Sequence, residues 1–275
     1  MATGEVATAL LVLVPLAGAA ASLLAGHRRL QRYIVGGTAA VLIIASVVLL
    51  LDMAGRGFTA LSISPPEELS TVVEALGIVL TVTFLYFGWR TRSVLVALFS
   101  VGELIMIGLL VASPGSEGPA LLIDTLALVL VLITSIVGSL IAVYSLTYMR
   151  DDPRRGTFLA VIVAFLGVMN AAVMCNDMRW FEVFWSATTL FSFLLIGHAR
   201  TDEAKNAARL ALIINTGGGL ALLMGARLLQ YYHDTYLLSD LMAGGAAGLA
   251  LLPFALLSIG AFTKSAQLPF QSWLL

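Results

Sequence analysis

The chain has 275 residues, of which 60% are hydrophobic and only 11% are charged. Soluble domains carry about 25% charged residues, so this composition excludes an ordinary soluble fold and indicates a protein that lies in a membrane. The formal net charge of −1 gives no sign of a nucleic-acid partner. Cys175 is the single cysteine, which excludes a disulfide framework and a cysteine-based metal site.

Long apolar runs follow one another along the chain and predict an all-α, polytopic bundle of transmembrane helices. A helix of about 20 apolar residues crosses the hydrocarbon core of a bilayer. Backbone groups in lipid must be hydrogen-bonded within the segment, which leaves helices as the form for these runs. We predict about nine segments, at residues 7–26, 33–53, 71–89, 93–112, 121–145, 156–174, 178–197, 206–229 and 246 to the end.

The basic residues between the segments predict how the chain crosses the membrane, because loops on the cytoplasmic side are enriched in lysine and arginine. Loops after odd-numbered segments carry ten positive charges, whereas loops after even-numbered segments carry two, Arg56 and Arg179. We therefore expect the N-terminus outside. The leading residues MATGEVA hold Glu5 and no basic residue, so the first segment is expected to be an anchor and not a cleaved signal peptide.

Several acidic residues fall within the apolar segments, where a charge is costly and needs a physical reason. Glu103 lies near the middle of its segment, so it is a candidate for proton binding or helix contact; the alternative is a neutral, hydrogen-bonded core acid. Glu74 and Asp124 stand near segment starts, which favours an interfacial position for the first and helix capping or packing for the second. Glu182 follows Arg179 by three residues, which indicates either an interfacial ion pair or a functional acid.

Lys264 is the basic residue that lies deepest in an apolar segment. About 15 residues of the ninth segment precede it, which corresponds to more than about 20 Å of helix. Pro269 cannot donate a backbone hydrogen bond and clashes with the preceding turn, so we expect the helix to break near it. The freed carbonyls, with Ser265 and Gln267, would line a wet cavity where an ammonium loses and regains a proton. The alternative is a kinked helix whose lysine pairs with a neighbouring subunit or a lipid.

The stretch around this lysine, GAFTKSAQLPFQSWL, resembles the signature of the antiporter-like subunits shared by complex I (its large proton-translocating subunit) and the Mrp sodium/proton antiporters (their large A-type subunit). Preceding stretches resemble the same family in order: LLIDTLALVLVLITSIVGSLIAVYSLTYMRDDPRRGTF, FWSATTLFSFLLIG and NAARLALIINTGGGLALLMG. The resemblance covers residues 121–275, which we take as one antiporter-like region, incomplete at its C-terminal end. Residues 1–120 form a second region of N-terminal helices with an extra helical pair at 71–112, for which the resemblance implies no role.

The resemblance implies a membrane subunit of a larger complex that moves protons, or exchanges sodium for protons, across a prokaryotic plasma membrane. The lysine of the broken helix, here Lys264, carries the proton, and we add Glu182 and Glu103 as candidate members of the relay. The chain itself is expected to hold no cofactor, metal or catalytic centre. Coupling to redox chemistry would then require partner subunits, as in a complex of the NADH-quinone oxidoreductase or hydrogenase type.

The sequence departs from the family pattern in two further places. The family's Trp-Glu pair, whose glutamate modulates the lysine, is Trp185-Ser186 here, and the nearest carboxylate is that of Glu182, one turn away. The family also continues into a second, inverted half, so we expect either a partner chain that supplies it or a fragment of a longer protein. Two other functions stay open: the membrane subunit of a bicarbonate-uptake complex with a zinc-bearing soluble partner, and a membrane scaffold that has lost transport.

Overall fold

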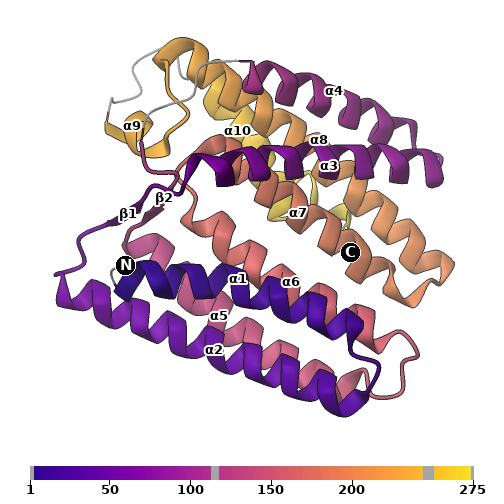
Figure 1. The fold of residues 1–275 in the computed structure, drawn as a ribbon. Coiled ribbons are helices and arrows are strands. Elements are labelled where there is room, and N and C mark those ends of the chain that lie inside the picture. Colours follow the sequence, from indigo (N-terminus) through magenta and orange to yellow (C-terminus); the bar gives the residue numbers. More distant parts are fainter. Residues whose placement is uncertain (1–2, 113–117, 244–250, 274–275) are drawn as a thin grey trace. The chain divides into compact units, whose positions relative to one another are not determined.

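The computed structural model describes residues 3–112, 118–243 and 251–273, which are almost entirely helical (Figure 1). Within these residues, seven helices are long and apolar enough to cross a membrane. The predicted all-α transmembrane bundle is therefore confirmed. The chain forms two compact units, and each unit combines segments from both sides of residue 120.

The first unit comprises residues 3–63 and 121–175. It contains four long helices and a two-stranded ribbon: α1 (Thr3–Leu24), α2 (Arg28–Gly55), α5 (Thr125–Tyr148), α6 (Arg155–Met174), β1 (Leu61–Ile63) and β2 (Leu121–Ile123). Helix α2 packs against α1 and α5, and α6 packs against the same two helices. The buried Asn170 of α6 donates hydrogen bonds to the Ser135 hydroxyl of α5 and the Leu11 carbonyl of α1, which ties three helices together.

The fifth helix begins later than the predicted 121–145. Leu121–Ile123 instead form β2, which pairs antiparallel with β1, and α5 starts at Thr125. The Asp124 carboxylate accepts a hydrogen bond of 2.7 Å from the backbone N–H of Ala127, so the chain turns from strand to helix at a side-chain cap. The start at residue 121 was wrong, because an apolar run alone does not distinguish strand from helix. The capping role of Asp124 is confirmed.

Replacing Asp124 with alanine should lower the free energy of unfolding by about 1 kcal/mol, because a backbone N–H at the start of α5 loses its acceptor. Thermal unfolding of the protein in detergent would show this loss. Asp124→Asn is the matched control: its amide oxygen also caps a helix start, so it should unfold close to the wild type. Equal loss in both variants would show that the cap contributes little.

The second unit comprises the described residues of 64–120 and 176–275. Its helices are α3 (Glu67–Arg90), α4 (Val94–Val111), α7 (Met178–Ile196), α8 (Asp202–His233), α9 (Leu238–Ala243) and α10 (Leu251–Lys264), with short 3-10 turns at Gly197–Ala199 and Gln271–Trp273. Helices α3 and α4 form the predicted extra pair and pack against α7 and α8 respectively, while α8 also packs against α7 and α10. The first residues of the predicted ninth segment, 246–250, lie outside the described residues.

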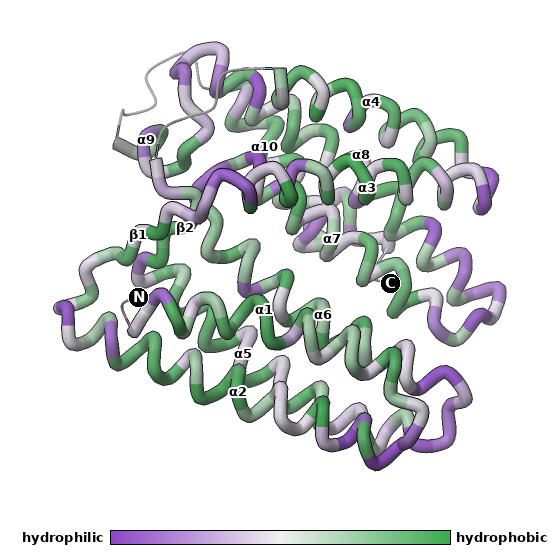
Figure 2. Tube along the Cα trace, in the orientation of Figure 1, coloured by the Kyte–Doolittle hydropathy of each residue, from purple (hydrophilic) through white to green (hydrophobic). Residues whose placement is uncertain are grey.

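Helices α3 and α7 run parallel, as two contacts show. Glu74 pairs with Arg179 near their starts, and the rings of Phe87 and Phe193 lie 4.8 Å apart near their ends. The turns that follow these two helices, with the helix ends that flank them, therefore lie at one end of the unit and carry Arg90, Arg92, Arg200 and Lys205. Hydrophilic residues gather at helix ends in both units, with hydrophobic residues along the helix lengths (Figure 2). This distribution agrees with the loop charges used to predict the orientation of the chain.

Helix α8 approaches its neighbours closely through consecutive glycines. A Cβ on Gly218 would overlap the Thr263 side chain of α10, and a Cβ on Gly217 would lie 3.1 Å from the Phe99 ring of α4. Neighbouring positions of a helix point about 100° apart, so the glycine run lets α8 contact different helices on successive faces. The result is that α10 is held directly against the middle of α8, which fixes the position of Lys264 along the length of α8.

Candidate functional site

Lys264 is the last residue of α10, and its side chain reaches α7. The Lys264 ammonium donates hydrogen bonds to the Thr189 hydroxyl at 2.8 Å and to the Trp185 carbonyl at 3.4 Å. It also lies over the Trp185 ring, 5.2 Å from the ring centre, a geometry that attracts a cation to the electron-rich face. The partners of Lys264 among the described residues are thus neutral groups of one helix.

The helix break is confirmed, but Pro269 is not its direct cause. Helix α10 ends at Lys264, and Ala266 adopts a left-handed conformation with φ of 51°. The backbone N–H of Gln267 bonds to the carbonyl of Phe262 at 3.0 Å, the six-to-one hydrogen bond of a Schellman motif. Pro269 follows this motif, where a proline commonly stands because it cannot continue the helix.

The residues after the break close over the helix end only in part. The Trp273 indole N–H donates to the Thr263 carbonyl at 2.9 Å, which satisfies one of the acceptors that a helix end leaves free. The Ser265 hydroxyl bonds back to a carbonyl one turn earlier at 2.7 Å. Ser265, Gln267 and Pro269 are exposed. They are therefore accessible to a neighbouring subunit or to water, as residues that line a wet cavity at the helix break must be.

Glu182 is buried, with 1% of its surface exposed, one turn into α7. Its Oε1 accepts a hydrogen bond of 2.7 Å from the Ser186 hydroxyl. Arg179, the alternative partner, instead pairs with Asp177 at 2.7 Å and with Glu74 at 3.6 Å. The ion pair between Glu182 and Arg179 was therefore a wrong alternative, and Glu182 is a buried acid held by a hydroxyl.

Glu103 of α4 has no exposed surface, and neither carboxylate oxygen has a hydrogen-bond partner among the described residues. Among the described residues, Glu103 is thus not a hydrogen-bonded core acid, which was the alternative interpretation. A Cβ on Gly219 would lie 2.7 Å from Glu103 Oε1 and 3.9 Å from Trp185 Cδ1. The Glu103 carboxylate therefore lies beside the same tryptophan that Lys264 covers, separated from it by the space that Gly219 leaves.

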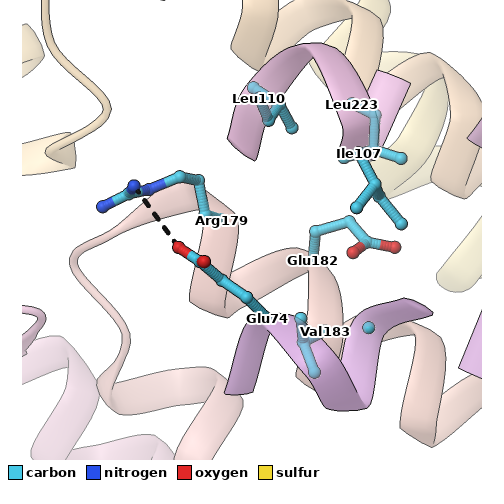
Figure 3. Close-up of a pocket in the computed structure, with 8 residues that line it drawn as sticks. Glu74, Ile107, Leu110, Arg179, Glu182, Val183 and Leu223 are labelled. Carbon is cyan, nitrogen blue, oxygen red and sulfur yellow. Dashed lines mark ion pairs between the residues drawn. The ribbon is translucent and has the colours of Figure 1, made fainter. Parts of the chain in front are cut away.

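A narrow cavity adjoins Glu182 where α3, α4, α7 and α8 meet (Figure 3). Its residues are Glu74, Gly77, Ile107, Leu110, Arg179, Glu182, Val183 and Leu223. Figure 3 shows Glu74 directed toward Arg179, whereas the Glu182 side chain turns away from this pair toward Ile107 and Leu223. The cavity thus lies between a partly exposed ion pair and a buried acid.

The sequence missed the neutral partners of the charged groups. Thr189 and Ser186 each follow another member of the site by four residues, the spacing that places two side chains on one helix face, and this signal could have found them. The contact of Gly219 with Glu103 joins two helices and had no local signal. The described residues contain no group of three or more His, Cys, Asp or Glu side chains able to hold a metal ion.

Comparison with known proteins matches the region that carries Lys264 and Glu182. A family model described as "NADH-Ubiquinone oxidoreductase (complex I), chain 5 N-terminus" matches residues 118–159, and one described as "NADH:quinone oxidoreductase/Mrp antiporter, TM" matches residues 175–275. The chain belongs to this antiporter-like subunit family. The predicted resemblance is confirmed, and residues 1–117, including α3 and α4, lie outside both matched ranges.

Curated relatives of this antiporter-like chain are bacterial. It is 35% identical over 159 residues to the A1 subunit of the Na(+)/H(+) antiporter of Staphylococcus haemolyticus, which covers 56% of this chain and 20% of that protein. It is 38% identical over 151 residues to the A/B subunit of a probable K(+)/H(+) antiporter of Rhizobium meliloti, which covers 52% of this chain and 15% of that protein. The chain therefore spans a fifth or less of the length of these relatives.

The family and the helices together identify the kind of protein. The described residues hold seven helices able to span a membrane, and the relatives are bacterial antiporter subunits. The chain is thus an integral protein of the plasma membrane. Family members are subunits of larger membrane assemblies.

Proposed function

We propose that this chain is an ion-translocating subunit of a multi-subunit Mrp-like or complex I-like complex, in which Lys264 takes up and releases the transported proton. The observation that carries the proposal is the position of the Lys264 ammonium. It lies at the end of a broken helix and is bound by the Thr189 hydroxyl and the Trp185 carbonyl. The end of α10 is already completed by backbone bonds and Trp273, so the lysine is not needed to cap the helix.

The partners of Lys264 suit a group that changes its charge. A hydroxyl is both an acceptor and a donor, so Thr189 can accept from an ammonium and donate to the lone pair of a neutral amine. A carboxylate partner would instead favour the charged lysine strongly. The Trp185 ring adds attraction for the charged form that disappears once the proton leaves. Both states of the lysine thus have a partner without large rearrangement.

Glu182 and Glu103 are proposed as further stations of the proton path. Glu182 lies on the helix that binds the lysine, one turn before Trp185 and Ser186, and Glu103 lies against Gly219 beside the Trp185 ring. Both are buried, so a proton that binds to either is separated from bulk water. We propose that Ser265, Gln267 and Pro269, exposed after the break, line the path on the other side of Lys264.

The partners are proposed to be other membrane subunits that continue the ion path beyond these residues. The exposed break around Ser265 and Gln267 is the surface on which helices of a partner would complete the site. The transported ions are protons and an alkali cation, as the names of the sodium/proton and potassium/proton antiporter relatives suggest.

The proposal is tested by cation-driven proton movement in membrane vesicles that contain the complete complex. Vesicles are acidified, and sodium or potassium is then added while a pH-sensitive dye reports the internal pH. We expect either cation to drive proton movement in vesicles with the complete complex, and not in vesicles from cells that lack this chain. Equal proton movement in both preparations would contradict the proposed function.

A further inference from the structure

The cavity beside Glu182 is built largely by the two helices that the family match does not cover. Half of its lining comes from α3 and α4, through Glu74, Gly77, Ile107 and Leu110. Helix α7 contributes Arg179, Glu182 and Val183, and α8 contributes Leu223. The pair α3–α4 therefore adds a feature to the antiporter region that the rest of the unit would not form alone.

The two ends of this cavity differ in their access to water. At one end, the Glu74 side chain is 28% exposed and pairs with Arg179 at 3.6 Å, while Asp177 holds the same guanidinium at 2.7 Å. At the other end Glu182 is 1% exposed and hydrogen-bonded to Ser186. Arg179 and Glu182 are three residues apart on α7, a rise of about 4.5 Å. A partly exposed acid and a buried acid thus border one space.

The size and the walls of the cavity select among the ions that could use it. Apart from space open to the surface, the cavity has room for about one water molecule. Its remaining walls are the side chains of Ile107, Leu110, Val183 and Leu223, which offer no oxygen ligands to replace the hydration shell of an alkali cation. A proton needs only a donor, a water and an acceptor; Glu74 and Glu182 border the cavity as titratable groups, and one water in its space would join them.

We propose that this cavity is a proton access site, built by α3–α4, that delivers protons to Glu182 and excludes sodium and potassium. The Glu74 carboxyl receives a proton from outside water and releases it to water in the cavity. That water passes a proton to the Glu182 carboxylate, and no other bond changes. The loop charges place this end of α7 on the outer side of the membrane. The inference rests on the proposed function, since it names the ion and the route by which it reaches the Lys264 site.

The test fills the cavity without altering a charged group. Ile107→Phe in the complete complex should lower proton flux at least about tenfold, because the added ring occupies the water space. The matched control is Ile105→Phe, the same substitution two residues away on α4, where the side chain is 56% exposed; its flux should equal that of the wild type. Glu74→Gln, at a partly exposed position and with nearly the same side-chain shape, should lower proton flux about tenfold as well.

Each outcome decides the matter. Unchanged flux in Ile107→Phe or in Glu74→Gln overturns the access site, as does equal loss in Ile107→Phe and Ile105→Phe, which would mark a general disturbance of α4. If Ile107→Phe does not assemble, the Glu74→Gln result alone decides. Lys264→Ala, measured in parallel, separates the two proposals: lost flux there with intact flux in Ile107→Phe removes only the access site, whereas intact flux in Lys264→Ala removes the proposed function as well.

Discussion

Replacing Lys264 with alanine is expected to abolish proton flux, by at least about 100-fold, while the complex still assembles. The substitution removes the group that takes up the proton and leaves the end of α10 intact, because the Schellman bond of Gln267 and the Trp273 indole bond involve the backbone of that turn. Flux is measured in vesicles with the complete complex, and assembly is checked by co-purification of its subunits.

Lys205→Ala is the matched control for this prediction. Lys205 is exposed on the first turn of α8 and pairs with Asp202 at 2.9 Å, a surface ion pair of the kind that contributes little. Its loss should change neither flux nor assembly. The opposite result is that Lys264→Ala lowers the amount of assembled complex, while the complex that does assemble keeps its proton flux. The lysine would then be a packing residue, as expected of a membrane scaffold.

Replacing Glu182 with glutamine is expected to lower proton flux by about 10 to 100-fold without loss of assembly. Glutamine has nearly the same shape, and its Oε1 can still accept the hydrogen bond of the Ser186 hydroxyl, so packing inside α7 is preserved. What is lost is the ability of a buried side chain to bind and release a proton. The measurement is the initial rate of proton flux at equal amounts of assembled complex.

Ser186→Ala separates the carboxylate from its hydrogen bond. This variant keeps Glu182 and removes only the hydroxyl that donates to Oε1, so its flux should fall much less than that of Glu182→Gln. A Glu182→Gln variant with wild-type flux would show that Glu182 is not part of the relay. An equal fall in both variants would show that the hydrogen bond, and not the proton, matters.

The membrane helices were predictable because each one needs only a long apolar run, and that requirement is local. The runs at 33–53, 71–89 and 206–229 became α2, α3 and α8 with ends displaced by a few residues. Residues 121–123 were not predictable in the same way. They are as apolar as the helix that follows, and they form a strand because β1 lies beside them and Asp124 caps the start of α5.

The same distinction applies to the candidate site: some of its features depend on neighbouring residues in the sequence, and others depend on contacts between helices. The unusual depth of Lys264 and Glu103 follows from their places in apolar runs, and Pro269 predicted a helix end near Lys264, although the Schellman motif at Ala266 forms that end. The partners of these groups depend on helix packing. Thr189 meets Lys264 because α10 lies against α8 and α8 against α7, and Glu103 meets the Trp185 region because Gly219 leaves room. These contacts cannot be predicted from the spacing of residues within one segment.

In the proposed function Lys264 binds and releases a proton and does not serve only as a fixed positive charge. Lys264→Arg separates these two roles, because arginine keeps a positive charge and can donate to Thr189, but it stays protonated under all ordinary conditions. Proton flux through the assembled Lys264→Arg complex is predicted to be as low as that of Lys264→Ala. Flux close to the wild type in Lys264→Arg would contradict the claim, and would make the lysine a positively charged anchor beside a path that other groups provide.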